Sequence, residues 1–217
     1  MTTKIVAGMH LPANDFHFTS HLEQNPIVDG KGTYQHKKIA LALEACKGRG
    51  VALDIGAHVG LWTRMLVIGG FDSVIAFEPV PDHIECFELN LKGYDGVTLM
   101  KCALGDKTAT VRIRQTADNT GMAHVSDDGP IIADMRRLDD LGLPKVDFIK
   151  LDVEGYEAEI IRGGERLIRR DRPFVVVEQK GREERYGVKR RGALDILQSW
   201  GMKIVWEKTG DYGLDWQ

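Results

Sequence analysis

The hydrophobic pattern of this chain is dominated by short apolar segments that end in an acidic residue. Four of them cover residues 51–55, 73–77, 146–151 and 173–178, and their acids are Asp54, Glu78, Asp152 and Glu178. Near-continuous apolar runs of this length are typical of parallel strands that are buried on both faces. Because the carboxyl ends of parallel strands meet at one edge of a sheet, we expect the four carboxylates to converge there.

Segments with apolar residues at helical spacing separate these strands. The pattern predicts helices over 34–45, 61–68, 81–91, 158–170 and 194–200. Further strands are predicted over 97–102 and 108–114, and a terminal hairpin joins 202–206 to 211–216. Strands that alternate with helices indicate an α/β fold built on a mostly parallel sheet.

Two polar stretches give a weaker pattern. In residues 1–35 the short apolar run 5–7 predicts an edge strand, and the remainder predicts a polar cap or a substrate-facing lid. Residues 115–130 predict a long loop, which at this position in a sheet protein is often functional. His17 in the first stretch and His124 in the second are candidates for substrate contact, and a histidine can also transfer protons near neutral pH.

Composition is that of a soluble globular protein of single-domain size. Of 217 residues, 43% are hydrophobic and 28% charged, and the net charge of −3 gives no general attraction to nucleic acid or anionic membranes. The apolar runs are too short to span a bilayer and no apolar signal segment is seen, so we expect a cytoplasmic protein. Three widely spaced cysteines form no metal-binding pattern. We expect a single domain over 1–217, with a cap and helix over 1–49 and a catalytic core over 50–217.

The turn after the first strand indicates a nucleotide-like cofactor. Gly56 and Gly60 allow backbone to pass close to a ligand, and the following helix start presents free N–H groups. The nearby acid Asp54 would repel a diphosphate but suits a ligand with an ammonium group, such as S-adenosylmethionine (SAM). Glu78 lies 24 positions after Asp54 (78 − 54), close to where a βαβ unit places an acid on ribose hydroxyls.

The end of the strand over 146–151 is the strongest candidate for catalysis. It carries Lys150, Asp152 and Glu154, which would point to the same side if the strand continued. Burying these groups beside Glu178 costs free energy unless cations, hydrogen-bond donors or a metal offset the charge. We therefore predict an active site here, with structural salt bridges to nearby arginines as the alternative. The charged run 182–191 predicts a solvated helix face, or else a site for an anionic group.

Five segments taken in order resemble the FkbM-type SAM-dependent methyltransferases. They are Asp54-Ile55-Gly56-Ala57-His58-Val59-Gly60, Phe77-Glu78-Pro79, Ala103-Leu104-Gly105-Asp106, Ile149-Lys150-Leu151-Asp152-Val153-Glu154-Gly155 and Val175-Val176-Val177-Glu178. The family usually has Asn at the position of His58 and often has Asn at that of Lys101. The resemblance implies a class I methyltransferase fold, which is a Rossmann-like, mostly parallel seven-stranded sheet flanked by helices with a terminal antiparallel hairpin.

The resemblance also implies an activity and roles for individual residues. Family members are O-methyltransferases that often act on hydroxyls of sugars or small metabolites. The cofactor-binding residues implied are Asp54, Gly56, His58 and Gly60 at the methionine part, Glu78 with Pro79 at the ribose, and Cys102 and Ala103 at the adenine. Asp152 or Glu154 is the expected base for the acceptor hydroxyl. Glu178 would orient the substrate or join Asp152 on a divalent metal ion, and Lys150 would tune either carboxylate.

Other functions remain open at this point. A nicotinamide-dependent oxidoreductase would need a third glycine and would not suit the acid before the turn. A non-catalytic SAM-binding scaffold would not need acids at four strand ends. A nucleic-acid methyltransferase is disfavoured by the net charge and by the absence of an Asn/Asp-Pro-Pro-aromatic segment after the fourth strand. The expected partner is a small-molecule or glycan acceptor, and a homo-oligomer is compatible with the sequence.

Overall fold

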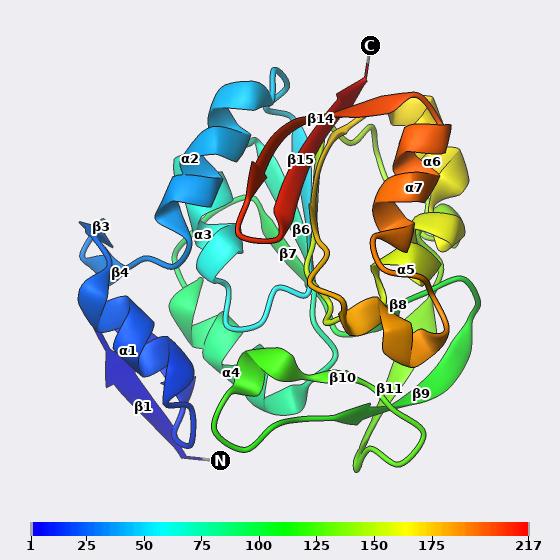
Figure 1. Cartoon of the computed structure of the whole chain (residues 1–217). Coiled ribbons are helices and arrows are strands. Elements are labelled where there is room, and N and C mark those ends of the chain that lie inside the picture. The colour runs from blue at the N-terminus through cyan, green and yellow to red at the C-terminus, as the bar shows by residue number, and fades with distance from the viewer. Residues whose placement is uncertain (1, 217) are drawn as a thin grey trace.

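A seven-stranded sheet forms the centre of the computed structural model, which describes residues 2–216 (Figure 1). Its strand order is β14-β15-β13-β12-β5-β6-β7. The parallel strands are β5 (Val51–Ile55), β6 (Ser73–Phe77), β7 (Val97–Met100), β12 (Phe148–Leu151) and β13 (Phe174–Glu178). The antiparallel hairpin consists of β14 (Met202–Lys208) and β15 (Asp211–Trp216), and it joins the sheet at β13. The predicted mostly parallel sheet with a terminal hairpin is confirmed.

Helices cover both faces of this sheet (Figure 1). They are α2 (His36–Ala45), α3 (Leu61–Ile68) and α4 (Pro81–Asn90) on one face and α5 (Glu157–Gly163), α6 (Glu165–Asp171) and α7 (Gly192–Ser199) on the other. Neighbouring strand residues alternate between the two layers, as the period of a strand requires. Ala52 and Phe148 are buried with α2 and α3, whereas Leu53 and Ile149 are buried with α5, α6 and α7.

The N-terminal segment docks against this core beside α4. It contains β1 (Thr3–Val6), β2 (Met9–Pro12), α1 (His17–Gln24), β3 (Ile27–Val28) and β4 (Lys31–Gly32). Asn90 of α4 exchanges two hydrogen bonds with the backbone of His10, at 2.7 and 2.9 Å. The fully buried Arg64 donates to the carbonyls of Val28 and Gly32. The short edge strand predicted over 5–7 corresponds to β1, which covers Thr3–Val6 and pairs with β2 in a hairpin separate from the main sheet.

A second, four-stranded sheet lies beside the carboxyl ends of the parallel strands. Its strands are β8 (Ala103–Leu104), β9 (Ala109–Arg114), β10 (His124–Val125) and β11 (Ile131–Arg136), in the order β10-β9-β11-β8. Three 3₁₀ turns are also formed, η1 (Thr120–Met122), η2 (Leu138–Asp140) and η3 (Arg182–Tyr186). The prediction of a long loop over 115–130 is therefore corrected: this stretch contains η1, and its strand β10 pairs with β9.

Two further predictions fail for reasons of local geometry. The helix expected over 158–170 is broken at Gly164 into α5 and α6, where Gly163 packs so closely on Gly105 that a Cβ would lie 2.0 Å from the Gly105 carbonyl oxygen. The strand expected to place residues 150, 152 and 154 on one side ends at Leu151, and Glu154 adopts a left-handed φ of 62°. Among residues 2–216, no helix combines the length and the apolar character needed to cross a bilayer.

Candidate active site

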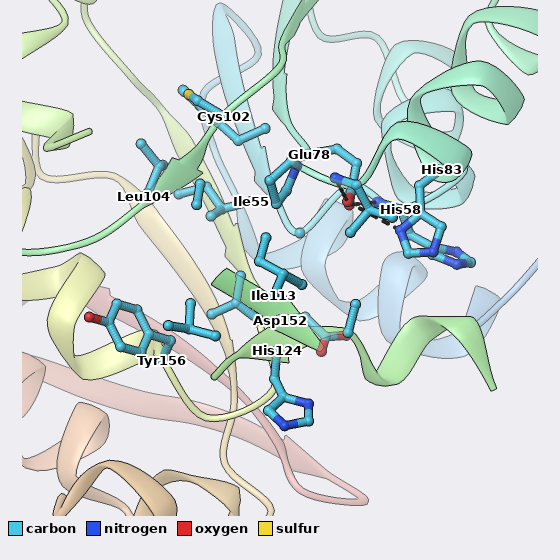
Figure 2. Close-up of a pocket in the computed structure, with 18 of the residues that line it drawn as sticks. Ile55, His58, Glu78, His83, Cys102, Leu104, Ile113, His124, Asp152 and Tyr156 are labelled. Carbon is cyan, nitrogen blue, oxygen red and sulfur yellow. Dashed lines mark hydrogen bonds and ion pairs between the residues drawn. The ribbon is translucent and has the colours of Figure 1, made fainter. Parts of the chain in front are cut away.

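The main cavity lies at the carboxyl ends of β5, β6 and β12 and is closed by the second sheet (Figure 2). Its empty space, counted together with the solvent at its open mouth, is about 610 Å³. Its apolar wall includes Ile55, Phe77, Leu104, Ile113 and Ile160. Eight residues singled out from the sequence also line it: Gly56, His58, Glu78, Pro79, Cys102, Ala103, His124 and Asp152.

Glu78 is held rigidly at the rim of this cavity. Its Oε2 accepts the His58 N–H at 2.8 Å, and its Oε1 accepts the Val80 N–H at 2.9 Å and bonds to His83 Nδ1 at 3.1 Å (Figure 2). His83 Nε2 in turn contacts the Gln115 amide at 2.9 Å. Because a carboxylate has about four acceptor positions, Glu78 keeps unused capacity for hydroxyl donors. Neither His83 nor Gln115 was expected from the sequence, although the spacing of five residues between Glu78 and His83 is compatible with a contact across the start of α4.

Asp54 and Gly60 contact other residues of the protein and do not line the main cavity. The fully buried Asp54 accepts from the Thr63 hydroxyl at 2.6 Å and pairs with Lys150 Nζ at 3.3 Å. Lys150 also donates to the Gly56 carbonyl at 2.8 Å, which fixes the glycine turn. A Cβ at Gly60 would lie 2.2 Å from the Leu91 side chain. Direct cofactor contact by Asp54 and Gly60 stays a prediction, and both have clear structural tasks.

Lys150 carries its charge in this buried position. Burial lowers the pKa of the Lys150 ammonium, but Asp54, Asp152 and Glu178 outweigh that effect and raise it overall. The charged ammonium therefore balances the buried Asp54 carboxylate and ties β12 to the turn after β5.

His58 occupies a strained position in that turn. Its φ of 51° is left-handed, a region in which Asn and His occur more often than other side chains. Its ring stacks on Phe18 with centroids 4.6 Å apart, and its Nε2 lies 2.8 Å from the Thr120 hydroxyl. Burial, followed by His83 and Lys150, lowers the pKa of His58 well below its usual value. The ring is therefore neutral at physiological pH.

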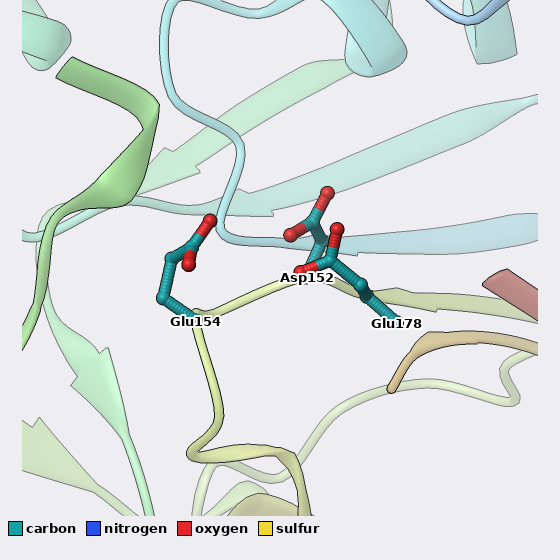
Figure 3. Close-up of side chains that lie close together, drawn as sticks. All are labelled: Asp152, Glu154 and Glu178. Atoms are coloured by element: carbon teal, nitrogen blue, oxygen red, sulfur yellow. The ribbon is translucent and has the colours of Figure 1, made fainter. Parts of the chain in front are cut away.

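Three carboxylates cluster beside the cavity, at Asp152, Glu154 and Glu178 (Figure 3). One oxygen from each lies within 4.8 Å of the others. Arg182 bridges Glu154 at 2.5 Å and Glu178 at 2.8 Å, and Lys180 bonds to the other oxygen of Glu178. The sequence predicted this convergence, and the salt bridges to an arginine that were its alternative are formed by Arg182. The expected solvated face of 182–191 is wrong for Arg182.

Two of the clustered carboxylates, Glu154 and Glu178, have raised pKa values. Burial and the neighbouring Asp152 and Glu178 raise the pKa of Glu154 to about 8. Burial and Asp152 raise the pKa of Glu178 to about 7, against the opposing effect of Lys180 and Arg182. A carboxylate with a pKa near neutrality is suited to accept a proton from a reacting group.

A second cavity lies on the other side of the cluster and encloses about 500 Å³ of empty space. One wall is aromatic and is formed by His17, Phe18 and Tyr34 of the N-terminal segment. The opposite wall holds the three carboxylates with Lys180 and Arg182. Asp152 and Gly121 line both this cavity and the main one, so the two spaces adjoin at these residues. His17 and His124 thus lie in different cavities.

The cluster also has the donor set of a divalent metal site, since carboxylate oxygens suit hard cations. The fit is poor, however, because Arg182 and Lys180 already neutralise Glu154 and Glu178. A divalent ion would have to displace both side chains. Without a metal ion, Lys180 and Arg182 already pair with two of the three carboxylates.

Comparison with known proteins gives a consistent result. The family model for the methyltransferase FkbM domain matches residues 54–204. The 2-O-methyltransferase NoeI of Sinorhizobium fredii is 30% identical over 189 residues, which cover 76% of this chain and 76% of NoeI. The hexuronic acid methyltransferase AglP of Haloferax volcanii is 27% identical over 146 residues, covering 64% of this chain and 60% of AglP.

A solved structure extends the likeness to the fold. The methyltransferase FkbM of Methylobacillus flagellatus superposes with a TM-score of 0.53 at 21% identity. The match covers 75% of this chain but only 42% of that protein. The shared part is thus a common fold within a longer relative.

Proposed function

The chain belongs to the FkbM family of SAM-dependent methyltransferases, and from that premise we propose that it methylates a hydroxyl group of a sugar or glycan. One observation supports the proposal above all others: Asp152 lines both the main cavity and the second cavity, with Glu154 and Glu178 beside it. A methyl donor on one side and a hydroxyl acceptor on the other would meet at these carboxylates. Membership in this family sets the nicotinamide-dependent oxidoreductase aside.

The main cavity is proposed as the SAM site. Its apolar wall suits the adenine, beside Cys102 and Ala103, and the unused acceptor capacity of Glu78 suits the ribose hydroxyls. Pro79 ends β6 next to Glu78 and so keeps that carboxylate at the rim. Gly56 lines this cavity, and it lets the turn after β5 pack against the end of β12, since a Cβ there would lie 2.0 Å from the Asp152 carbonyl oxygen. When bound, SAM supplies an activated methyl group to a nucleophile in line with its carbon–sulfur bond.

Glu154 is proposed as the base. The acceptor oxygen forms a bond to the methyl carbon, the electron pair of the broken carbon–sulfur bond stays on sulfur, and the hydroxyl proton passes to Glu154. The pKa of about 8 gives this carboxyl group a useful affinity for that proton, and the step uses the ionised fraction of Glu154, which grows as the pH rises toward 8. Asp152 and Glu178 orient the acceptor hydroxyls, and Lys150 holds the turn at Gly56. Because Arg182 and Lys180 balance the charge, the proposal needs no metal ion.

The second cavity supports a sugar as the acceptor. Sugar rings combine an apolar C–H face with a rim of hydroxyls, and this cavity combines the aromatic wall of Phe18 and Tyr34 with a wall of carboxylates. His17 and His124 are proposed as substrate contacts from the two sides. The names of two relatives, a 2-O-methyltransferase and a hexuronic acid methyltransferase, agree with this class of acceptor.

The test measures release of S-adenosylhomocysteine (SAH) from SAM with neutral methyl glycosides, the matching uronic acids, amines and thiols as acceptors. We expect turnover with at least one sugar and a loss of about 10²-fold or more in Asp152→Asn or Glu154→Gln. The matched control is Glu184→Gln, which changes an exposed acid in η3. Turnover on amines alone would overturn the proposed acceptor class. SAM binding with no turnover on any acceptor would favour a scaffold instead.

A further inference from the structure

A buried hydrogen-bond chain connects the N-terminal segment to the cofactor turn. Asp15, which is fully buried, accepts the Phe18 N–H through Oδ1 at 2.7 Å. Its Oδ2 accepts both the N–H of Thr120 at 2.9 Å and the hydroxyl of Thr120 at 2.5 Å. The Thr120 hydroxyl then meets His58 Nε2 at 2.8 Å. Residues from three distant parts of the sequence thus act on one imidazole ring.

The chain of contacts determines which ring nitrogen of His58 carries the proton. A carboxylate offers only lone pairs, so the single proton of the Thr120 hydroxyl points toward Asp15. The hydroxyl oxygen can then only accept from His58, and Nε2 must be the protonated nitrogen. Since the ring is neutral, Nδ1 carries a free lone pair.

That lone pair has no partner within the protein. Among residues 2–216, His58 Nδ1 is a buried atom without a hydrogen bond. A buried acceptor without a hydrogen bond is unfavourable, so a ligand donor at this atom would supply the missing hydrogen bond. Phe18 stacks on the ring and His83 contacts it at 4.2 Å between centroids, which keeps the ring in place.

The surroundings of His58 match the amino acid end of SAM. His58 lines the main cavity and also a smaller adjoining one, together with Gly56, Lys150 and Asp152. Lys150 donates to the Gly56 carbonyl and forms an ion pair with Asp54, so its ammonium retains N–H donors for a carboxylate. Asp54, the residue expected from the sequence to hold an ammonium group, is fully buried, accepts from Thr63 and lines neither of these two cavities. His58 lines both cavities and is the candidate acceptor for the ammonium.

We propose that Asp15 and Thr120 are positioning residues that hold His58 with Nδ1 as the acceptor for the methionine ammonium of SAM. This inference rests on the proposed SAM site and adds to it. It gives the N-terminal segment, which lies outside the matched family domain, a direct effect on cofactor affinity. The ribose hydroxyls do not compete for this atom, because Glu78 retains acceptor capacity for them.

Two changes test the positioning role. Asp15→Asn keeps the oxygen that accepts the Phe18 N–H but turns an NH₂ group toward Thr120. The Thr120 N–H then loses its acceptor, and the Thr120 hydroxyl accepts from the NH₂ group, donates to His58 and moves the ring proton to Nδ1. Thr120→Val removes the hydroxyl altogether, and Thr120→Ser restores it. Asp118→Asn, an exposed change in the same loop, is the matched control. Nitrogen NMR of the His58 ring reports the protonated nitrogen in each variant.

Calorimetric titration with two ligands separates positioning from structural damage. SAH carries the ammonium group, whereas methylthioadenosine lacks the whole amino acid end. We expect Asp15→Asn and Thr120→Val to bind SAH about tenfold to a hundredfold more weakly and methylthioadenosine as wild type does. Thr120→Ser and Asp118→Asn should bind both ligands as wild type does. The NMR signals should show Nε2–H in wild type and Nδ1–H in Asp15→Asn.

Several results would overturn the inference. Equal losses for SAH and methylthioadenosine would assign Asp15 and Thr120 a purely structural role. Unchanged SAH binding in both variants, or a wild-type His58 ring protonated at Nδ1, would refute the proposed ammonium contact. Neither result would count against the proposed methyltransferase site. Wild-type protein that binds neither ligand would instead overturn the proposed SAM site, and the inference with it.

Discussion

Replacing Glu154 by Gln removes a buried charge without changing the size of the side chain. Glu154 is 6% exposed and lies within the cluster of Asp152 and Glu178. Its pKa rises from 4.5 to about 8 in the folded protein, mainly because of burial and then because of these two carboxylates. The carboxyl group that we propose as the base is therefore a source of instability once it ionises. We expect Glu154→Gln to be inactive and yet more stable than wild type at alkaline pH.

The size of the effect follows from the two pKa values. Between pH 6 and pH 8 the unfolded chain has released this proton while the folded chain keeps it. A group whose pKa is raised by folding stabilises the folded state at low pH and loses that contribution as the pH rises through the folded value. The loss is about 1.4 kcal/mol per pH unit, or about 3 kcal/mol over this interval. The Gln side chain does not titrate and escapes this loss.

Urea denaturation at several values between pH 6 and pH 9 measures the effect. The free energy of unfolding of Glu154→Gln, minus that of wild type, should rise with pH by about 3 kcal/mol. Taking the difference cancels groups that titrate in both proteins. Glu184→Gln, which changes an exposed carboxylate of η3, should give a difference that is flat with pH. A flat difference for Glu154→Gln as well would refute the claim that burial raises this pKa.

Three further changes test other parts of the account. Glu78→Gln should weaken SAM binding about tenfold to a hundredfold in calorimetry, because the ribose loses a charged acceptor, and unchanged affinity would contradict the ribose assignment. Lys150→Met leaves Asp54 buried without its cation, so the free energy of unfolding in urea should fall by about 3–5 kcal/mol; a loss below about 1 kcal/mol, the scale of a surface pair, would contradict the pairing. Gly163→Ala places a Cβ 2.0 Å from the Gly105 carbonyl oxygen, and such overpacking should cost about 1–3 kcal/mol and lower Tm in a thermal melt. A Tm equal to that of wild type would show that α5 can shift.

The fold and the acid cluster could be predicted because their signals are local. Apolar runs that end in acids define the parallel strands, and topology alone brings their carboxyl ends together. Asp152 and Glu178 therefore lie near each other in the structure as the sequence indicated. Glu78 lines the cavity with Gly56 for the same reason. Each of these residues directly follows, or closes, a strand.

The remaining features depend on contacts between distant segments. Thr120 and Asp15 are 105 positions apart, and neither belongs to a repeating pattern. The break between α5 and α6 lies where Gly163 packs against Gly105, which belongs to the connection between β8 and β9. Arg182 was expected to be solvated because its neighbours are charged, but the end of β13 carries it onto Glu154 and Glu178. Tertiary packing overrides local composition in all three cases.

Transfer of an isotope-labelled methyl group tests the central claim most directly. The protein is incubated with methyl-labelled SAM and the sugar acceptors, and NMR of the products locates the label. The account predicts an O-methyl signal on a sugar ring carbon, formed in equal amount to SAH, and its absence with Glu154→Gln. Label found on nitrogen, or SAH formed without any methylated sugar, would contradict it.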